Sequence, residues 1–177
     1  DGVMVDDYSG AFNAVNHLIS RGCERIALYS SPQHMLIGRN RFEGYKDALL
    51  KNNIKFNKDL VYACDTFESA MKISRSVLKK HDRPDGIFAV NDLTAVGVLK
   101  VAKQLGIKIP EELKVVGFEN SQSASICEPE LTSVDQFGYN LGKKSAELLL
   151  KRITADDFNY KPESLKLKTE LIIRKSS

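Results

Sequence analysis

Residues 84–97 read PDGIFAVNDLTAVG, and this stretch decides the fold class. Residues 86–90 form a short run that is apolar on both faces, which is typical of a parallel strand buried between helices. Asn91 and Asp92 follow where this strand should end, and Asp92 is expected to cap the helix that begins there. A buried strand followed directly by a helix is the repeating unit of an α/β protein.

The same unit recurs along the chain. Gly22 and Gly106 stand where two predicted helices should stop. The alternation predicts right-handed βαβ units in a doubly wound parallel sheet. Strands are predicted at residues 26–30, 60–64, 86–90 and 114–118, and helices near residues 10–21, 39–53, 68–81, 93–105 and 138–153.

The C-terminal part departs from this pattern. Residues 154–163 are polar and are expected to form an exposed connection. Residues 165–174 alternate between apolar and polar side chains at first and predict a late strand with one face toward water, near a sheet edge.

Composition restricts the class of protein. The 177 residues are enough for one domain with a core, and 42% hydrophobic with 28% charged residues is the balance of a soluble globular protein. A net charge of +3 is too small to indicate a nucleic-acid partner by itself. Three cysteines without paired spacing indicate no disulfide framework and favour a reducing cytoplasm. We find no membrane-spanning run and no signal peptide, although the first residues resemble the middle of a domain.

Polar side chains follow the predicted strands. In an open α/β sheet, small molecules bind outside the carboxyl ends of the strands. Amide, carboxylate and guanidinium groups can pair with adjacent hydroxyls, and an aromatic ring can cover the C–H face of a sugar. This rim therefore suits a polyhydroxylated small molecule, and its members are Ser30–His34, Arg39, Arg41, Asp65–Phe67, Asn91, Asp92 and Glu119–Ser121.

Motifs of nucleotide-binding and hydrolytic enzymes are missing from the sequence. It contains no Gly-x-Gly-x-x-Gly, no Gly-Lys-Ser/Thr loop and no Gly-x-Ser-x-Gly elbow. Its histidines, His17, His34 and His81, do not stand at metal-ligand spacing with cysteines or carboxylates. We therefore predict no catalytic activity, no cofactor and no metal.

Six segments, in register over nearly the whole chain, resemble the LacI family of bacterial transcription regulators. Each segment alone would be a weak signal, but their shared order makes the resemblance specific. The segments are HLISRG with RIA (residues 17–27), RFEGY (41–45), PDGIFAVNDLTAVG (84–97), GIKIPEELKVVGF (106–118), PELTSVDQ (129–136) and TELIIRKS (169–176).

The resemblance implies a two-lobed, periplasmic-binding-protein-like type I fold with an effector in the cleft. Residues 25–134 plus 165–177 would form a nearly complete C-terminal lobe, and residues 1–24 plus 138–163 part of the N-terminal lobe. The DNA-binding headpiece is expected to be absent from this chain. By family position the effector would contact or border Arg41, Asn91, Phe67, Glu119 and Gln136, with Asp92 as a further candidate.

Each of these residues also has a structural interpretation. Arg41 could form a surface salt bridge, Asn91 and Asp92 could only cap a helix, and Phe67 could belong to the core. Glu119 could be a solvated loop acid, and Gln136 could serve only the crossover between lobes. Two departures reshape the pocket: Glu119 stands where many relatives have Asp, and residues 35–37 are apolar where several relatives have a hydroxyl or arginine.

The resulting prediction is an effector-sensing domain of a cytoplasmic LacI-type regulator or repressor that binds a sugar-like ligand. DNA binding would use the absent headpiece. The resemblance also implies a homodimer, formed through the helix near Ser69, the helix around Val96 and Lys100, and the loop near Ile126 and Cys127. The alternative is the sugar-binding protein of a transport system, which has the same fold.

Overall fold

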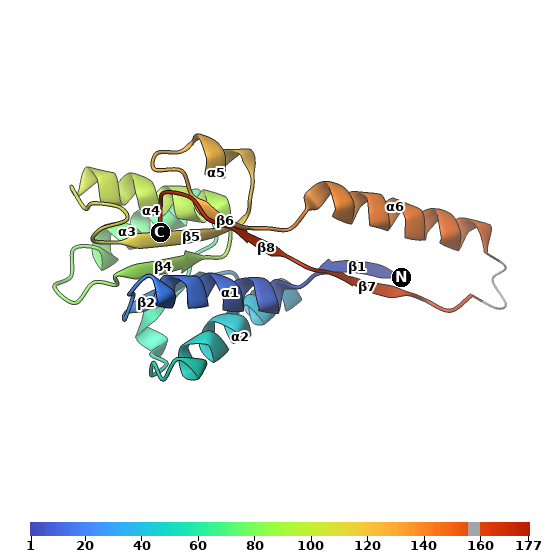
Figure 1. Ribbon diagram of the computed structural model, residues 1–177, viewed down its shortest axis with the longest axis horizontal. Coiled ribbons are helices and arrows are strands. Elements are labelled where there is room, and N and C mark those ends of the chain that lie inside the picture. Colours follow the sequence, from blue (N-terminus) through green and yellow to red (C-terminus); the bar gives the residue numbers. More distant parts are fainter. Residues whose placement is uncertain (156–159) are drawn as a thin grey trace.

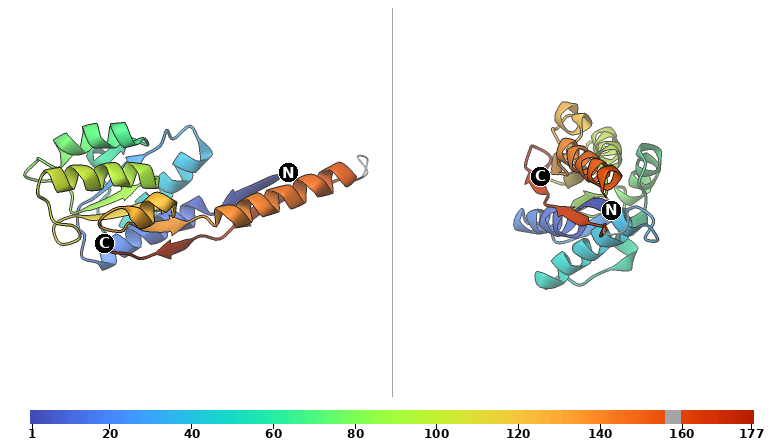
Figure 2. Two further views of the ribbon diagram at one scale, coloured as in Figure 1. Left: turned by 90° about the horizontal axis from the view of Figure 1, so that it is seen from above. Right: turned by 90° about the vertical axis from the view of Figure 1, so that its right-hand side faces the viewer.

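The computed structural model describes residues 1–155 and 160–177, and these residues form a core and an arm (Figure 1). The arm comprises strands β1 (Gly2–Val5) and β7 (Ser164–Leu167) with helix α6 (Gly138–Thr154). The core contains the remaining helices and strands. Figure 2 shows the arm projecting from one end of the core.

The core is built on a six-stranded sheet in the order β3-β2-β4-β5-β6-β8. The first five strands are parallel, and β8 lies antiparallel to β6 at the edge. This arrangement confirms the predicted doubly wound sheet. The bounds are β2 Ile26–Ser30, β3 Val61–Ala63, β4 Gly86–Ala89, β5 Lys114–Glu119, β6 Thr132–Asp135 and β8 Glu170–Ile172.

Helices cover both faces of this sheet. Two apolar clusters result, one between the sheet and each helical layer, which explains why β2 and β4 are buried along their whole length. Helices α1 (Asp7–Ser20) and α2 (Leu36–Lys51) lie on one face. Helices α3 (Phe67–Val77), α4 (Asp92–Gln104) and the short α5 (Gln122–Ile126) lie on the other, and a 3-10 turn, η1 (Lys58–Leu60), precedes β3.

Helix α1 packs in the core, whereas the family resemblance predicts that residues 1–24 group with residues 138–163. Its apolar side chains Ala11, Ala14, Val15 and Leu18 are all 0% exposed and pack in the cluster shared with α2 and the sheet. The amphipathic pattern correctly indicated a buried face, but it could not say which sheet would cover that face. The division of a whole protein into two lobes stays a proposal.

The helix ends follow the chemistry of capping, with one correction. The cap of α4 is Asn91, whose Oδ1 accepts a hydrogen bond from the Thr94 amide at 2.8 Å. Asp92, the predicted cap, is instead the first residue of the helix. Gly22 and Gly106 have φ of +87° and +71°, which confirms both as left-handed helix stops.

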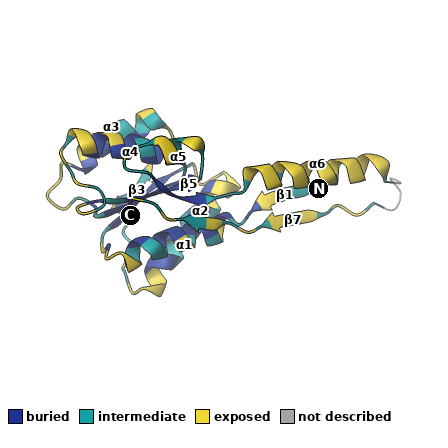
Figure 3. Ribbon diagram, turned by 45° about the horizontal axis from the view of Figure 1, so that its top comes forward, coloured by how far each residue is buried: buried dark blue, intermediate teal, exposed yellow. Residues whose placement is uncertain are grey.

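The arm is only partly covered (Figure 3). Strand β1 pairs in parallel with β7, and α6 lies along β1. Leu148 is the buried residue of α6, whereas Leu149, Leu150 and Ile153 are 59%, 63% and 69% exposed. The single late strand predicted at residues 165–174 is two strands in the structure: β7 pairs in the arm and β8 pairs in the core sheet.

Two further predictions concern the polar connection after residue 153 and membrane-spanning segments. The predicted connection over residues 154–163 falls partly on residues 156–159, which lie outside the described residues. None of the described helices is long and apolar enough to cross a membrane.

Candidate functional site

Arg41 lies at the centre of the carboxyl edge of the sheet and is only 5% exposed. Its Nε and Nη2 lie 2.8 and 2.7 Å from Oδ1 of Asp7, and its Nη1 donates to the Val90 carbonyl. The guanidinium carbon also stands 3.7 Å from the centroid of the Phe118 ring. Arg41 thus connects α2 with α1, β4 and β5, and these contacts use three of its five N–H groups.

Burial governs the electrostatics of this pair. Desolvation lowers the pKa of Arg41 and raises the pKa of Asp7, while the mutual attraction of the two groups opposes both shifts. Removal of one partner would leave the other as an unpaired buried charge. The pair is therefore a structural link as well as a candidate ligand contact.

Asp92 lies beneath the rim and is 0% exposed. Its Oδ2 accepts from the Ser121 amide and hydroxyl at 2.7 and 2.9 Å, and its Oδ1 accepts from the Ser133 hydroxyl at 2.6 Å. Desolvation raises the pKa of Asp92, and these hydrogen bonds act against the rise. The close fit also requires Gly117, because a Cβ there would stand 2.4 Å from Asp92 Oδ1.

Asn91 and Glu119 form the accessible part of the rim. Asn91 is half-buried, and besides capping α4 it donates from Nδ2 to the Asp65 carbonyl at 2.8 Å. Glu119 is exposed at the end of β5, where partial desolvation and the nearby Asp92 raise its pKa and Arg41 lowers it. Glu119 has φ of +124°, a strained conformation for a residue with a Cβ and one that is often found at functional sites.

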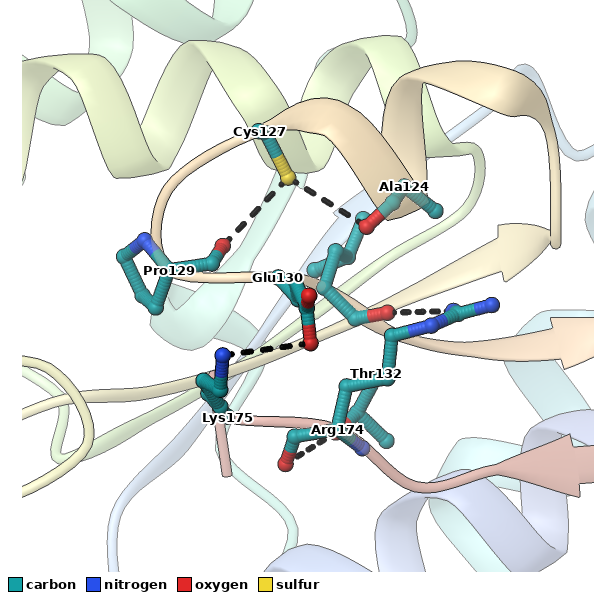
Figure 4. A network of polar contacts seen from close by, with 8 residues as sticks. Ala124, Cys127, Pro129, Glu130, Thr132, Arg174 and Lys175 are labelled. Carbon is teal, nitrogen blue, oxygen red and sulfur yellow. Dashed lines mark hydrogen bonds and ion pairs between the residues drawn. The ribbon is translucent and has the colours of Figure 1, made fainter.

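Asn120, the next residue, ties this rim to the crossover that leads into the arm. Its Nδ2 donates to Asp135 at 2.9 Å, and its Oδ1 accepts from the Arg174 guanidinium at 2.6 Å. Arg174 also donates to the Leu131 carbonyl at 2.7 Å, and its amide donates to the Thr132 hydroxyl at 2.9 Å (Figure 4). These bonds give Arg174 a structural role, because they connect β8 with β6 and with the loop after β5.

Gln136 follows β6 and lines a cavity of about 380 Å³ at the junction of core and arm. This cavity is also lined by Asp7, the partner of Arg41, so Gln136 and the charged pair border neighbouring space. The other lining residues are Val3, Met4, Val5, Leu36, Ile37, Asn40, Leu141 and Lys166. A volume of this size is in the range of small-molecule pockets.

Phe67 stands apart from these residues. Its ring lies 5.4 Å from the Lys100 ammonium, in the third turn of α4, and its carbonyl faces Gly97. The structure therefore brings together Arg41, Asn91, Asp92 and Glu119, sets Gln136 beside the adjoining cavity, and leaves Phe67 on the α3–α4 side of the core.

Sequence reasoning missed Asp7 and Ser133, one of the two serines that hold Asp92, whereas Ser121 belongs to the predicted rim. Asp7 has the ordinary look of an acid in the first turn of a helix, and no local signal relates it to Arg41, 34 residues later. Ser133 lies in β6, which was expected only as part of a crossover segment because its sequence, TSVD, is short and polar. Among the described residues no group of three or more His, Cys, Asp or Glu side chains is arranged to hold a metal ion.

Comparison with known proteins gives a consistent result. The sequence profile described as "Periplasmic binding protein-like domain" matches residues 15–177. The HTH-type transcriptional regulator CelR of Thermobifida fusca is 35% identical over 175 residues, which is 98% of this chain and 51% of that protein. The HTH-type transcriptional repressor CytR of Escherichia coli K12 is 33% identical over 99% of this chain and 51% of its own length. The chain thus spans about half the length of these curated relatives.

Solved structures agree with the sequence comparisons. A complex of the transcriptional regulator CelR with cellobiose superposes with a TM-score of 0.92 at 35% identity, over 99% of this chain and 53% of that one. A LacI family regulator from Enterococcus faecium with bound ribose superposes with a TM-score of 0.89 at 29% identity, over 100% of this chain and 65% of that one.

Proposed function

Because the chain belongs to the periplasmic binding protein-like domain family, in the form found in LacI-family transcriptional regulators, we propose that it senses a small polar effector for such a regulator. The effector is a sugar or a sugar-like molecule. The observation that carries this proposal is the polar cluster at the carboxyl edge of the sheet, where Asn91 and Glu119 are accessible and Arg41 keeps N–H groups outside its structural contacts. A cellobiose complex and a ribose complex among the structural neighbours support a sugar.

The site residues divide into two proposed roles. Asn91, Glu119 and Gln136 contact the effector, and Arg41 contributes its remaining N–H groups while holding Asp7. Asp92 supports the rim without touching the effector, because its oxygens already accept three hydrogen bonds. Phe67 contributes to the α3–α4 face.

Calorimetry with the full-length protein tests the site. D-ribose and cellobiose are the first probes, since neighbouring structures contain them. For any sugar that binds, Asn91→Ala and Glu119→Gln should each weaken binding about tenfold or more, because a buried hydroxyl of the ligand loses its partner. Asn57→Ala, at the opposite end of the sheet, is the matched control. Affinities of both site variants equal to that of the control would reject the site.

We further propose that the intact protein works as a cytoplasmic homodimer and binds DNA through a segment outside this chain. The relatives are transcription regulators and not enzymes, which supports this class over catalysis and over a transport component. The dimer would use the face with Leu93 and Ile126, which are 56% and 74% exposed. A gel-shift assay of this chain alone should show no sequence-specific DNA binding, and light scattering of the full-length protein should report a dimer that Ile126→Glu weakens.

A further inference from the structure

A second cavity lies at the amino end of the core sheet, opposite the polar rim. Residues 24–26 line it where β2 begins, so the length of β2 separates it from Ser30 at the carboxyl edge. Its volume is about 480 Å³, against about 380 Å³ for the cavity at the junction of core and arm. The other lining residues come from the second half of α2, the loop after it and η1, and are Tyr45, Leu49, Ile54, Lys55, Phe56, Asn57 and Leu60.

The loop after α2 forms an apolar wall of this cavity, and its backbone is fixed. The Ile54 amide donates to the Leu49 carbonyl at 2.9 Å, and Asn53 has φ of +59°, so the helix ends in a left-handed stop that turns the chain back. Phe56 then meets Tyr45 edge-on, with ring centroids 6.4 Å apart, and the Tyr45 hydroxyl donates to a carbonyl of β2 at 2.9 Å. A wall that is already in place lowers the ordering cost of binding a ligand.

Arg25 supplies a cation to the same cavity and is held in position at both ends. Its amide donates to Asp85 Oδ1 at 2.9 Å, and its Nε donates to the Asp82 carbonyl at 2.6 Å. Its Nη2 donates to Asp82 Oδ2 at 3.0 Å. These side-chain bonds use two of the five N–H groups of the guanidinium, and Nη1 takes part in neither of them. Arg25 can therefore bind an anion through Nη1 without giving up Asp82.

The other charged side chains of the lining narrow the choice of ligand. Lys55 is exposed and forms no ion pair with any residue that the structure describes. Arg25 and Lys55 together outnumber Glu24, the single acid of the lining, which favours an anion. Glu24 also disfavours a second negative charge on the ligand. A carboxylate carries one charge and accepts strong hydrogen bonds from both guanidinium and ammonium groups.

We propose that this cavity binds a small monocarboxylic acid with an aromatic or branched apolar body. The carboxylate pairs with Nη1 of Arg25 and with the Lys55 ammonium, and the body lies on Ile54 and Phe56, which are half-buried. The cavity is a ligand site separate from the rim that is proposed to bind the sugar-like effector. The inference does not rest on the proposed function, because the two sites lie at opposite ends of the sheet and take ligands of different chemistry.

Methyl NMR of the full-length protein tests the site, with the Ile54 methyl signals as the reporter and Ile54→Val used to assign them. Two pairs of probes share an apolar body with and without the charge: benzoate with benzyl alcohol, and isovalerate with isopentyl alcohol. At least one acid should shift the signals saturably, with a dissociation constant in about the millimolar range for so few atoms. Its alcohol should bind about tenfold more weakly, because the charge-assisted hydrogen bonds are lost. Acetate, which has the charge without the body, should also bind about tenfold more weakly.

Charge-removing variants complete the test. Lys55→Gln should weaken binding of the acid about threefold, and Arg25→Gln with Lys55→Gln should abolish the preference for acid over alcohol. Lys58→Gln, an exposed lysine of η1 outside the lining, is the matched control and should keep the wild-type affinity. If the double variant fails to fold for want of the ion pair between Arg25 and Asp82, Lys55→Gln alone decides. Equal affinities for each acid and its alcohol, an affinity in Lys55→Gln equal to that of the control, or shifts that never saturate would each overturn the inference.

Discussion

The core and the arm are built from the same kinds of element but differ in how completely they are covered. In the core, helices lie on both faces of the sheet, and β2 and β4 are buried throughout. In the arm, one helix covers one face of a two-stranded sheet. Val5 and Leu148 are the buried apolar residues among the described residues of the arm. A helix and a sheet become stable by burying an apolar face against a partner. The core therefore carries its own stability, whereas the arm depends on whatever covers its open side.

The largest expected difference concerns ion pairs. Arg41→Ala should reduce the free energy of unfolding by about 3–5 kcal/mol, because it leaves the buried Asp7 without its partner. In the arm, Lys166→Ala removes an ion pair to Asp6 in which the lysine side chain is 56% exposed, and the cost should be below about 1 kcal/mol. Urea denaturation measures both. Adding Asp7→Ala to Arg41→Ala should recover part of the loss, and equal losses for the two single variants would contradict the comparison.

Packing should give the next largest difference. Leu28→Ala in β2 removes a side chain that is 0% exposed and should cost about 3 kcal/mol of global stability. Leu148→Ala in α6 should instead increase hydrogen exchange in the arm and change global unfolding by less than about 0.5 kcal/mol, because the arm can open locally. If Leu148→Ala lowered global stability as much as Leu28→Ala, core and arm would unfold as one unit.

Sequence alone was sufficient for the strands of the core that are buried on both faces, and insufficient for the helices that have one apolar face. The runs at residues 26–30 and 86–90 are apolar on both faces, and that pattern has one common explanation, a parallel strand under two helical layers. The amphipathic residues 10–21 and 138–153 show one apolar face each, and nothing local says which sheet will cover it. As a result α1 was grouped with the arm segments, although it packs in the core.

The residues of the candidate site also fall into those that the sequence could predict and those that it could not. Asn91 and Glu119 could be found because strand ends in a parallel sheet share one edge, so sequence position predicts spatial position. Asp7 could not be found, because its contact with Arg41 depends on how α1 and α2 cross. Phe67 follows a strand as the others do, but its ring turns toward Lys100, since strand-end position does not determine side-chain direction.

A smaller effect should appear in the pH dependence of the core. Burial, with a lesser contribution from Arg21, lowers the pKa of His17 from 6.5, and its Nε2 lies 2.9 Å from the Ser177 hydroxyl. The unfolded state then binds the proton more readily, so stability is complete above pH 6.5 and is lost as pH falls from there through the lower, folded-state pKa.

His17→Gln should therefore flatten the dependence of the free energy of unfolding on pH between about pH 7.5 and about pH 5. Urea denaturation across this range provides the measurement. His34→Gln, in an exposed loop, is the control substitution. A wild-type slope in His17→Gln would mean that another group is responsible.

The smallest effect on stability is expected on the open side of the arm, where the difference in coverage between core and arm can be tested most directly. Leu149→Ser with Ile153→Ser changes side chains that are 59% and 69% exposed, and the free energy of unfolding of this chain should stay within about 0.5 kcal/mol of wild type. Self-association should nevertheless decrease, because an uncovered apolar face drives chains together. Light scattering over a concentration series measures this, with Lys143→Ser on the same helix as the matched control.

In the full-length protein we propose that further chain covers this face, so the same double variant should there lower the free energy of unfolding. If both the wild-type chain and the double variant are monomeric, the open side of the arm does not drive self-association. A full-length protein that loses no stability would show that nothing packs on it.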